Sequence, residues 1–151
     1  MSDSSDTDVR RRVEEIIAAF IEKEADLLIN NSSEQAITHR LAVMLEHEFG
    51  EWHVDCEYNR DQDAVKRLKY AISPEHPVEE KDVVPDIIIH ERMSPNNFIV
   101  FEVKKSTNPE PDEKDLAKLL AFKEQLGYQN ACFVRFVVGP PSPAIQRLEW
   151  V

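Results

Sequence analysis

Apolar residues recur every three or four positions through the first third of the chain, which is the spacing of one face of an α-helix. Over 9–28 this pattern predicts a helix that Thr7 or Asp8 can cap. A second helix is expected between Ser32, a suitable N-cap, and Gly50, a suitable C-terminal stop. The region up to Gly50 is therefore predicted to be helical.

After Gly50 the pattern changes from helical spacing to alternation. Apolar and polar residues alternate over 52–58, which is typical of a half-buried strand. Residues 59–82 are polar and contain two prolines, so we expect a long insertion there, with a short helix at 64–72.

Two nearly continuous apolar stretches follow the insertion, at 83–91 and 98–104. The Ser-Pro-Asn-Asn sequence at 94–97 has the composition of a turn, so the two stretches are expected to pair as a β-hairpin. Helical spacing returns at 113–126, and a further apolar strand is expected at 131–138. A strand, a helix and a strand of these lengths predict a parallel crossover.

The expected order is α-α-β-β-β-α-β, which predicts an α/β protein with a mixed four-stranded sheet flanked by helices. Residues 9–151 are expected to form one domain, because 151 residues are close to the usual size of a single domain. Residues 1–8 are expected to be a disordered acidic tail, and 144–151 could pack as a short element.

Composition limits the class of protein. Charged residues make up 31% of the chain, and no apolar run approaches the length of a membrane span. There are only two cysteines and no C-x-x-C motif, so we expect a cytoplasmic protein without disulfides or a structural zinc site. The net charge of −11 argues against tight binding to duplex DNA by the chain alone, although a local basic groove remains compatible with it.

Charged residues interrupt the apolar runs 83–89 and 98–104 of the hairpin strands, where a charge is costly unless it is paired or solvated. They are Asp86 in the first strand and Glu102 and Lys104 in the second. If Asp86 lies opposite Glu102, the turn is centred on Ser94, and if it lies opposite Lys104, the turn is centred on Pro95. Both registers place all three side chains on one face of the hairpin.

Two carboxylates and a lysine on one face have a specific chemical use. Opposed Cβ atoms lie about 4.5–5.5 Å apart, close enough for Asp86 and Glu102 to share one cation. Oxygen ligands of this kind suit Mg²⁺, which Mn²⁺ can replace. A neighbouring lysine can orient or deprotonate water and offset negative charge on a phosphoryl group.

Glu34 is a fourth candidate because it lies on the inward face of the second predicted helix, together with Ile37 and Leu41. An acidic residue in the first turn of a helix also interacts favourably with the helix dipole. Both interpretations of Glu34 remain open. Glu57, at the end of the first predicted strand, could also lie near the site, but the alternation favours a solvated strand face.

Pro85-Asp86, followed after fifteen residues by Glu102-Val103-Lys104, resembles the motif of the PD-(D/E)XK nuclease superfamily. The resemblance covers about residues 32–138 and includes the element order. It implies a restriction-endonuclease-like fold and Mg²⁺-dependent hydrolysis of phosphodiester bonds. The triplet at 112–114 also fits the second half of the motif, but it lies at a polar helix start, so the context selects Glu102 and Lys104.

Residue by residue, the resemblance implies that Asp86 and Glu102 bind the metal ion and that the Val103 carbonyl could be a third ligand. Lys104 would act on the attacking water, and Glu34 would be an auxiliary acid that is also a candidate metal ligand. Members of the superfamily often carry another polar residue on the following helix, for which Lys118 is the nearest match.

The main functional hypothesis is therefore a metal-dependent nuclease that acts on nucleic acid, with DNA as the expected substrate, alone, as a homodimer or with a protein partner. The alternative is a binding or regulatory module that has the same fold without useful turnover. An acidic structural protein is the third hypothesis, and the charges inside both hairpin strands argue against it.

Overall fold

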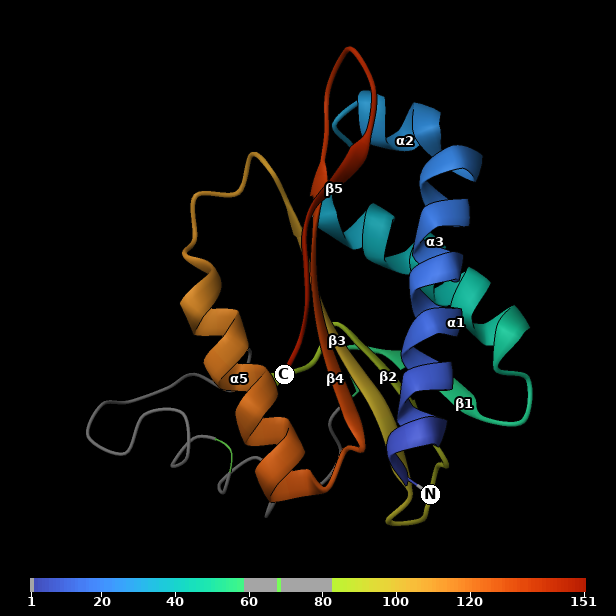
Figure 1. Cartoon of the computed structure of the whole chain (residues 1–151). Coiled ribbons are helices and arrows are strands. Elements are labelled where there is room, and N and C mark those ends of the chain that lie inside the picture. The colour runs from blue at the N-terminus through green and yellow to red at the C-terminus, as the bar shows by residue number, and fades with distance from the viewer. Residues whose placement is uncertain (1, 59–67, 69–82) are drawn as a thin grey trace.

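The structure is a computed structural model that describes residues 2–58, Leu68 and 83–151 (Figure 1). The insertion expected at 59–82, and the short helix expected at 64–72, lie outside the described residues except for Leu68, which is buried. The chain is an α/β protein in which helices precede a five-stranded mixed sheet, and another helix connects two of the strands.

Three helices open the fold: α1 (Ser2–Lys23), α2 (Ala25–Ile29) and α3 (Glu34–Glu48). Helix α1 includes residues 2–8, for which the sequence predicts a disordered tail and a cap at Thr7 or Asp8. Acidic residues are favourable near the positive end of a helix, so the acidic composition of this segment is compatible with helix formation. The Asp8 carboxylate accepts a hydrogen bond from Arg11, one turn further on.

The ends of α3 differ by a residue or two from the prediction. Ser33, not Ser32, is the N-cap, and its Oγ accepts a hydrogen bond of 3.1 Å from the Ala36 N–H. The C-cap is Phe49, not Gly50. Glu34 is therefore the first residue of the helix, directly after the N-cap Ser33.

The sheet has the strand order β1-β2-β3-β4-β5. The first three strands pair antiparallel, β3 and β4 pair parallel, and β4 and β5 pair antiparallel. The strand bounds are β1 His53–Cys56, β2 Ile87–His90, β3 Asn97–Lys105, β4 Asn130–Val137 and β5 Ala144–Trp150.

Helix α5 (Asp112–Leu126) connects the parallel strands β3 and β4, as the strand, helix and strand pattern predicts. It ends at Gly127, which has a left-handed conformation with φ 71°. The helix and the parallel pairing of its two flanking strands are thus confirmed.

The prediction of a four-stranded sheet was wrong because the last segment forms the edge strand β5. Its side chains are only partly buried or exposed, so β5 lacks the continuous apolar run that identifies a central strand. The pairing of β5 with β4 also contains a bulge, beside Arg135 and Phe136 of β4, which interrupts the alternation of side chains along β5.

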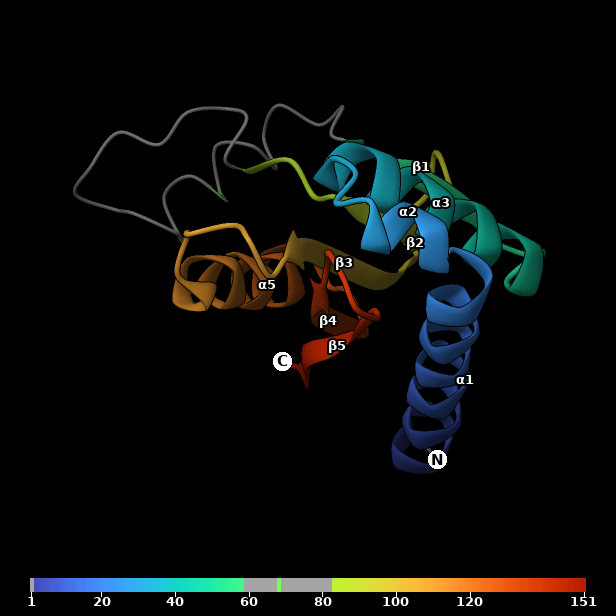
Figure 2. The ribbon, with the colours of Figure 1, turned by 90° about the horizontal axis from the view of Figure 1, so that it is seen from above.

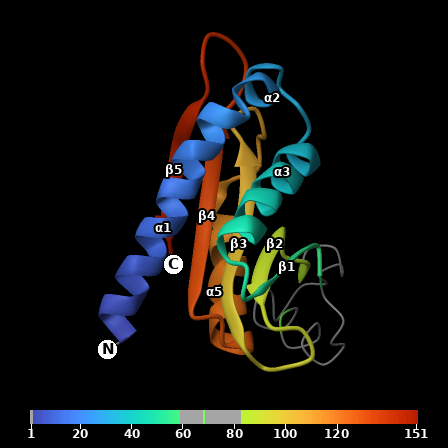
Figure 3. The same ribbon diagram turned by 90° about the vertical axis from the view of Figure 1, so that its right-hand side faces the viewer.

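The sheet separates two hydrophobic cores. Helices α1, α2 and α3 cover one face of the sheet and α5 covers the other, as Figures 1 and 2 show. Ile99, Phe101 and Val103 of β3 belong to the core on the side of α1 and α3, whereas Val100 packs in the core beneath α5. Odd and even residues of β3 therefore point to opposite layers. Figure 3 shows β3 in the middle of the sheet.

None of the described helices is long and apolar enough to cross a membrane.

Candidate functional site

The register of the β2–β3 hairpin sets the position of the site. Ile87 pairs with Phe101, and Ile88 pairs with Val100. One step further in the same register, Asp86 lies opposite Glu102. Of the two registers that the sequence allows, the structure has the one that opposes the two carboxylates.

Asp86 is joined to the neighbouring residues Glu102 and Val103 by two hydrogen bonds. The Asp86 N–H donates to Glu102 Oε2 at 2.9 Å, and the Val103 N–H donates to Asp86 Oδ2 at 2.8 Å. Pro85, which precedes Asp86, has no N–H and cannot contribute a donor to the sheet ladder. Side-chain carboxylates thus complete the hydrogen bonding where the β2–β3 ladder ends.

Lys104 lies on the same face of β3 as Glu102, as the spacing of two residues predicts. Its Nζ contacts Glu110 Oε2 at 2.7 Å and Asp115 Oδ2 at 3.4 Å. The Lys104 side chain is 12% exposed, so it extends under α5 and the loop before it. In this arrangement both partners of the Lys104 ammonium come from outside the hairpin.

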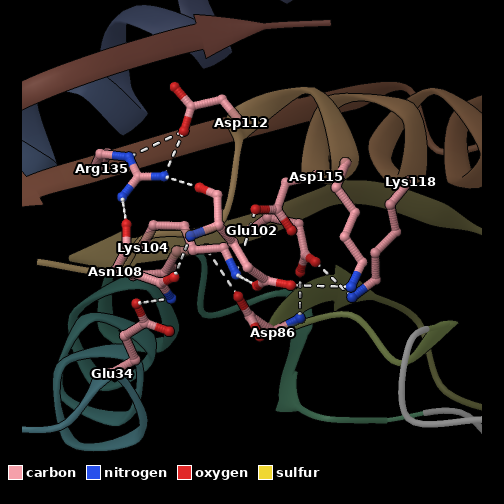
Figure 4. A network of polar contacts seen from close by, with 12 residues as sticks. Glu34, Asp86, Glu102, Lys104, Asn108, Asp112, Asp115, Lys118 and Arg135 are labelled. Atoms are coloured by element: carbon pink, nitrogen blue, oxygen red, sulfur yellow. Dashed lines mark hydrogen bonds and ion pairs between the residues drawn. The ribbon is translucent and has the colours of Figure 1, made fainter. Parts of the chain in front are cut away.

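Lys118 of α5 reaches Glu102 directly. Its Nζ lies 2.6 Å from Glu102 Oε1 (Figure 4). The resemblance pointed to Lys118 only as the nearest match for a polar residue on this helix, and the structure places it in contact with a candidate metal ligand.

Asp115 is a member of this group that the sequence reasoning missed. It is 6% exposed and lies three residues before Lys118 and four before the buried Leu119. That spacing puts Asp115 on the inward stripe of α5. The signal was present in the helical periodicity, because a charged residue on an apolar stripe is unusual unless it has a partner.

Burial and charge shift the pKa values within the group. Burial, and then the nearby Asp86 charge, raises the pKa of Glu102 to about 8. Burial also raises the pKa of Asp86, and the hydrogen bond from the Val103 N–H opposes that rise. The buried Glu102 and the half-buried Asp86 therefore form a pair of carboxylates beside which a cation would be favourable.

Lys104 and Glu110 shift in the directions expected for an ion pair. Burial alone would lower the pKa of Lys104, but the Glu110 hydrogen bond and the charge of Asp115 raise it above its ordinary value. The hydrogen bonds from Lys104 and Lys114 lower the pKa of Glu110 to about 2. The Lys104 side chain is therefore a permanent cation around neutral pH.

Glu34 connects α3 with the end of β3. Its Oε2 accepts hydrogen bonds from the Lys105 N–H at 3.0 Å and from the Asn108 side-chain amide at 2.7 Å. These contacts place the Glu34 side chain toward the sheet, in agreement with its position on the inward face of the helix. They also give Glu34 a structural role at the end of the strand.

A cavity of about 290 Å³ opens beside the hairpin. Its lining includes Glu34, Asp86 and Val103, and it also includes Glu57, which the alternation favours as a solvated residue. Asp86 thus contacts two regions: the cavity on one side, and the Glu102 cluster beneath α5 on the other. The complete lining consists of Glu34, Gln35, Thr38, His39, Cys56, Glu57, Asp86 and Val103.

The loop between β3 and α5 is held by Arg135 of β4. The guanidinium donates to the main-chain carbonyls of Lys105, Asn108 and Glu110, and to the Asp112 carboxylate. The Arg135 side chain is 8% exposed. It thereby fixes the loop that delivers Glu110 to Lys104.

Within the described ranges 2–58, 68 and 83–151, no group of three or more His, Cys, Asp or Glu residues could hold a metal ion. Glu34 therefore does not join Asp86 and Glu102 in a three-carboxylate metal site, and the candidate site keeps only the carboxylates of Asp86 and Glu102. This number suits Mg²⁺, which keeps several waters and binds through one or two carboxylates together with substrate phosphates. Both Glu102 oxygens have partners in the structure, the Asp86 N–H and the Lys118 ammonium, so a cation could bind there only if the Lys118 contact opened.

Comparison of the chain with protein-family models, with curated proteins and with solved structures finds no match to any of them. The assignment of a function therefore depends on the residues and contacts of the site itself.

Proposed function

We propose that this protein is a metal-dependent nuclease of the PD-(D/E)XK type that hydrolyses phosphodiester bonds in DNA. One observation supports this most strongly: the half-buried Asp86 and the buried Glu102 are opposed across the hairpin, and the Asp86 N–H donates a hydrogen bond to the Glu102 carboxylate. Lys104 shares their face of the sheet, two residues after Glu102. The proposal combines this arrangement with the motif to which the sequence is similar.

The proposed roles follow from the contacts. Asp86 and Glu102 hold a divalent cation, with the Val103 carbonyl as an additional oxygen, and Glu34 lines the adjoining cavity as the auxiliary acid. A bound Mg²⁺ would supply Lewis-acid activation of the phosphate and of a water molecule. The carboxylates orient that cation, and the cavity beside Asp86 gives the water and the phosphate access to it.

Lys104 is proposed to act as a fixed positive charge. Its raised pKa keeps the ammonium protonated, so it can donate a hydrogen bond and offset negative charge on the transferring phosphoryl group. The same shift argues against Lys104 as the base that removes a proton from water. Of the two roles that the sequence allows, the electrostatic one has the better support.

A second candidate function, binding without turnover, is favoured by the charges around Lys104. Its ammonium is in contact with both Glu110 and Asp115, so it has to give up one of these partners to reach a phosphate. The net charge of −11 also opposes the approach of an anionic polymer.

Cleavage assays distinguish the two candidates. Purified protein with Mg²⁺ or Mn²⁺ is expected to cut single-stranded or double-stranded DNA, and Asp86→Asn, Glu102→Gln and Lys104→Met should each lower the rate at least about 100-fold. Glu113→Gln and Lys123→Met are matched controls on α5 that remove one negative and one positive charge outside the group. Their rates should equal that of the unmodified protein.

Each negative result has a distinct meaning. Cleavage that persists in Asp86→Asn and Glu102→Gln would contradict the assignment of the site. An unmodified protein that binds Mn²⁺ but cuts no DNA would favour the binding module instead.

A further inference from the structure

Glu102 is buried, so solvent can do little to stabilise its carboxylate when that group is ionised. It is 1% exposed, and the contacts to its two oxygens come from different elements. Oε2 accepts the Asp86 N–H at 2.9 Å, and Oε1 contacts the Lys118 ammonium at 2.6 Å. The positive charge beside Glu102 is therefore supplied by Lys118 of α5.

That contact conflicts with binding of a divalent cation. A metal ligand has to present a free lone pair, and an ammonium in contact with the same oxygen repels an approaching cation. The repulsion is strong because Lys118 is only 11% exposed, so little water screens it. Cation binding at Glu102 thus requires the Lys118 side chain to move.

The structure also provides a place to which Lys118 can move. Asp115 Oδ2 is buried and has no hydrogen-bond partner within the described part of the chain, although Lys104 Nζ lies 3.4 Å away. Asp115 precedes Lys118 by three residues on α5, a separation that brings two side chains to the same face of a helix. Figure 4 shows the Asp115 and Lys118 side chains next to each other above Glu102 and Asp86.

We propose that Lys118 is an internal counter-ion of the site, which occupies Glu102 in the metal-free protein and transfers to Asp115 when a divalent cation binds. This inference deepens the proposed function and depends on the same cation site at Asp86 and Glu102. It assigns Lys118 and Asp115 the task of setting the metal affinity without contacting the substrate.

Calorimetric titration with Mn²⁺ tests the exchange in four proteins: the unmodified chain, Lys118→Met, Asp115→Asn and the double variant. Lys118→Met should bind Mn²⁺ at least about tenfold more tightly, because the competing buried ion pair is gone. Asp115→Asn should weaken binding, because Lys118 loses its charged alternative acceptor. In the double variant the Asp115→Asn substitution should have no further effect.

This double-mutant cycle distinguishes a transfer of Lys118 from Glu102 to Asp115 from simple effects of the two charges on the cation. If Asp115 and Lys118 acted only through their charges, the two substitutions would change the binding free energy additively. Lys123→Met, which removes a positive charge from the same helix, should leave the Mn²⁺ affinity unchanged. If Lys118→Met does not fold, Lys118→Gln, which keeps a hydrogen-bond donor near Glu102, takes its place.

The outcomes distinguish this inference from the proposed function. Equal Mn²⁺ affinity in the unmodified protein and in Lys118→Met overturns the counter-ion role while preserving the metal site. If the two substitutions change the Mn²⁺ binding free energy additively, the exchange of Lys118 between Glu102 and Asp115 is also overturned. Absence of Mn²⁺ binding from both proteins overturns the inference and the proposed metal site together. If Lys118→Met binds Mn²⁺ and the unmodified protein does not, the inference is supported, because Lys118 then excludes the ion from the unmodified protein.

Discussion

The carboxylate of Glu110 shows how a single residue on a loop can control the charge of the site. It accepts hydrogen bonds from Lys104 at 2.7 Å and from Lys114 at 2.9 Å. Because these contacts favour its ionised form, the folded protein has a Glu110 pKa of about 2, compared with the ordinary value of 4.5. Glu110 thereby makes folding stability dependent on pH.

A lowered carboxyl pKa gives stabilisation that is complete above the ordinary pKa and is lost as the pH falls toward the folded-state value. We therefore expect Glu110→Gln to unfold at lower urea concentration than the unmodified protein at pH 6. The difference between the two midpoints should shrink as the pH falls from about 4.5 to about 2. The Glu110 side chain is 43% exposed, so the effect should be modest.

Urea denaturation at pH 6 and at pH 2.5 measures this difference. Glu113→Gln, an exposed residue on the first turn of α5, is the control and should show no comparable change with pH. A difference for Glu110→Gln that stays constant over this range would contradict the assigned pKa shift.

The sequence predicts some residue positions in the site better than others. Asp86, Glu102 and Lys104 could be placed on one face because strand alternation and a short turn determine which side chains share a face. The partners of Lys104 and Glu102 could not be predicted in this way. They come from α5 and the preceding loop, whose position over the sheet depends on tertiary packing.

At the scale of elements, the residues at helix ends largely determine where each helix stops. Gly127 ends α5 with φ 71°, a conformation that residues with a Cβ rarely adopt. No atom lies within 4 Å of where a Cβ on Gly127 would be, so the cost of a side chain there is conformational and not steric. The geometry of the Gly127 backbone therefore selects glycine.

Gly127→Ala is expected to lower the free energy of unfolding by about 1 kcal/mol. Gly50→Ala is the matched control, because a Cβ there also meets no atom within 4 Å and the Gly50 backbone is not left-handed. That substitution should be neutral or slightly stabilising, since alanine restricts the unfolded chain. Chemical denaturation of both variants provides the comparison, and equal effects would contradict the role of the left-handed conformation.

The central elements were predictable, and the peripheral ones less so. Strands β3 and β4 are nearly continuous apolar runs because helices cover both faces of the sheet. Strand β5 lies at an edge and is only partly buried, so its sequence lacks that signal. Helix α1 extends further toward the N-terminus than its apolar stripe, because polar residues can continue a helix without packing.

On the scale of the whole molecule, the candidate site lies between two layers of helices that do not contact it in the same way. The α3 side contributes Glu34 and the cavity, and the α5 side contributes Asp115 and Lys118. Strand β3 and the residues beside it connect the two sides. Cation binding should therefore be coupled to the stability of the whole fold.

A ligand that binds only the folded chain stabilises it by mass action, by about 2.7 kcal/mol at a free concentration 100 times Kd. We expect Mn²⁺ to raise the urea midpoint of the unmodified protein in this concentration-dependent way. Glu102→Gln should abolish the effect, because it removes a charged ligand while preserving the size of the side chain. A Mn²⁺ response that survives in Glu102→Gln would place the ion elsewhere on the molecule.

Besides the Asp112 carboxylate, Arg135 holds the connection between β3 and α5 through the peptide oxygens of Lys105, Asn108 and Glu110. Every residue type supplies the same carbonyl, so these three contacts do not depend on the side chains of the connection, whereas the Asn108 side chain adds bonds of its own to Glu34 and to the Glu110 N–H. Thr107 and Pro109, which lie between these anchor points, can be exchanged as long as the backbone keeps its course. For protein engineering, this connection is a place where new side chains can be presented near Glu34, which contacts Asn108, without redesigning the scaffold.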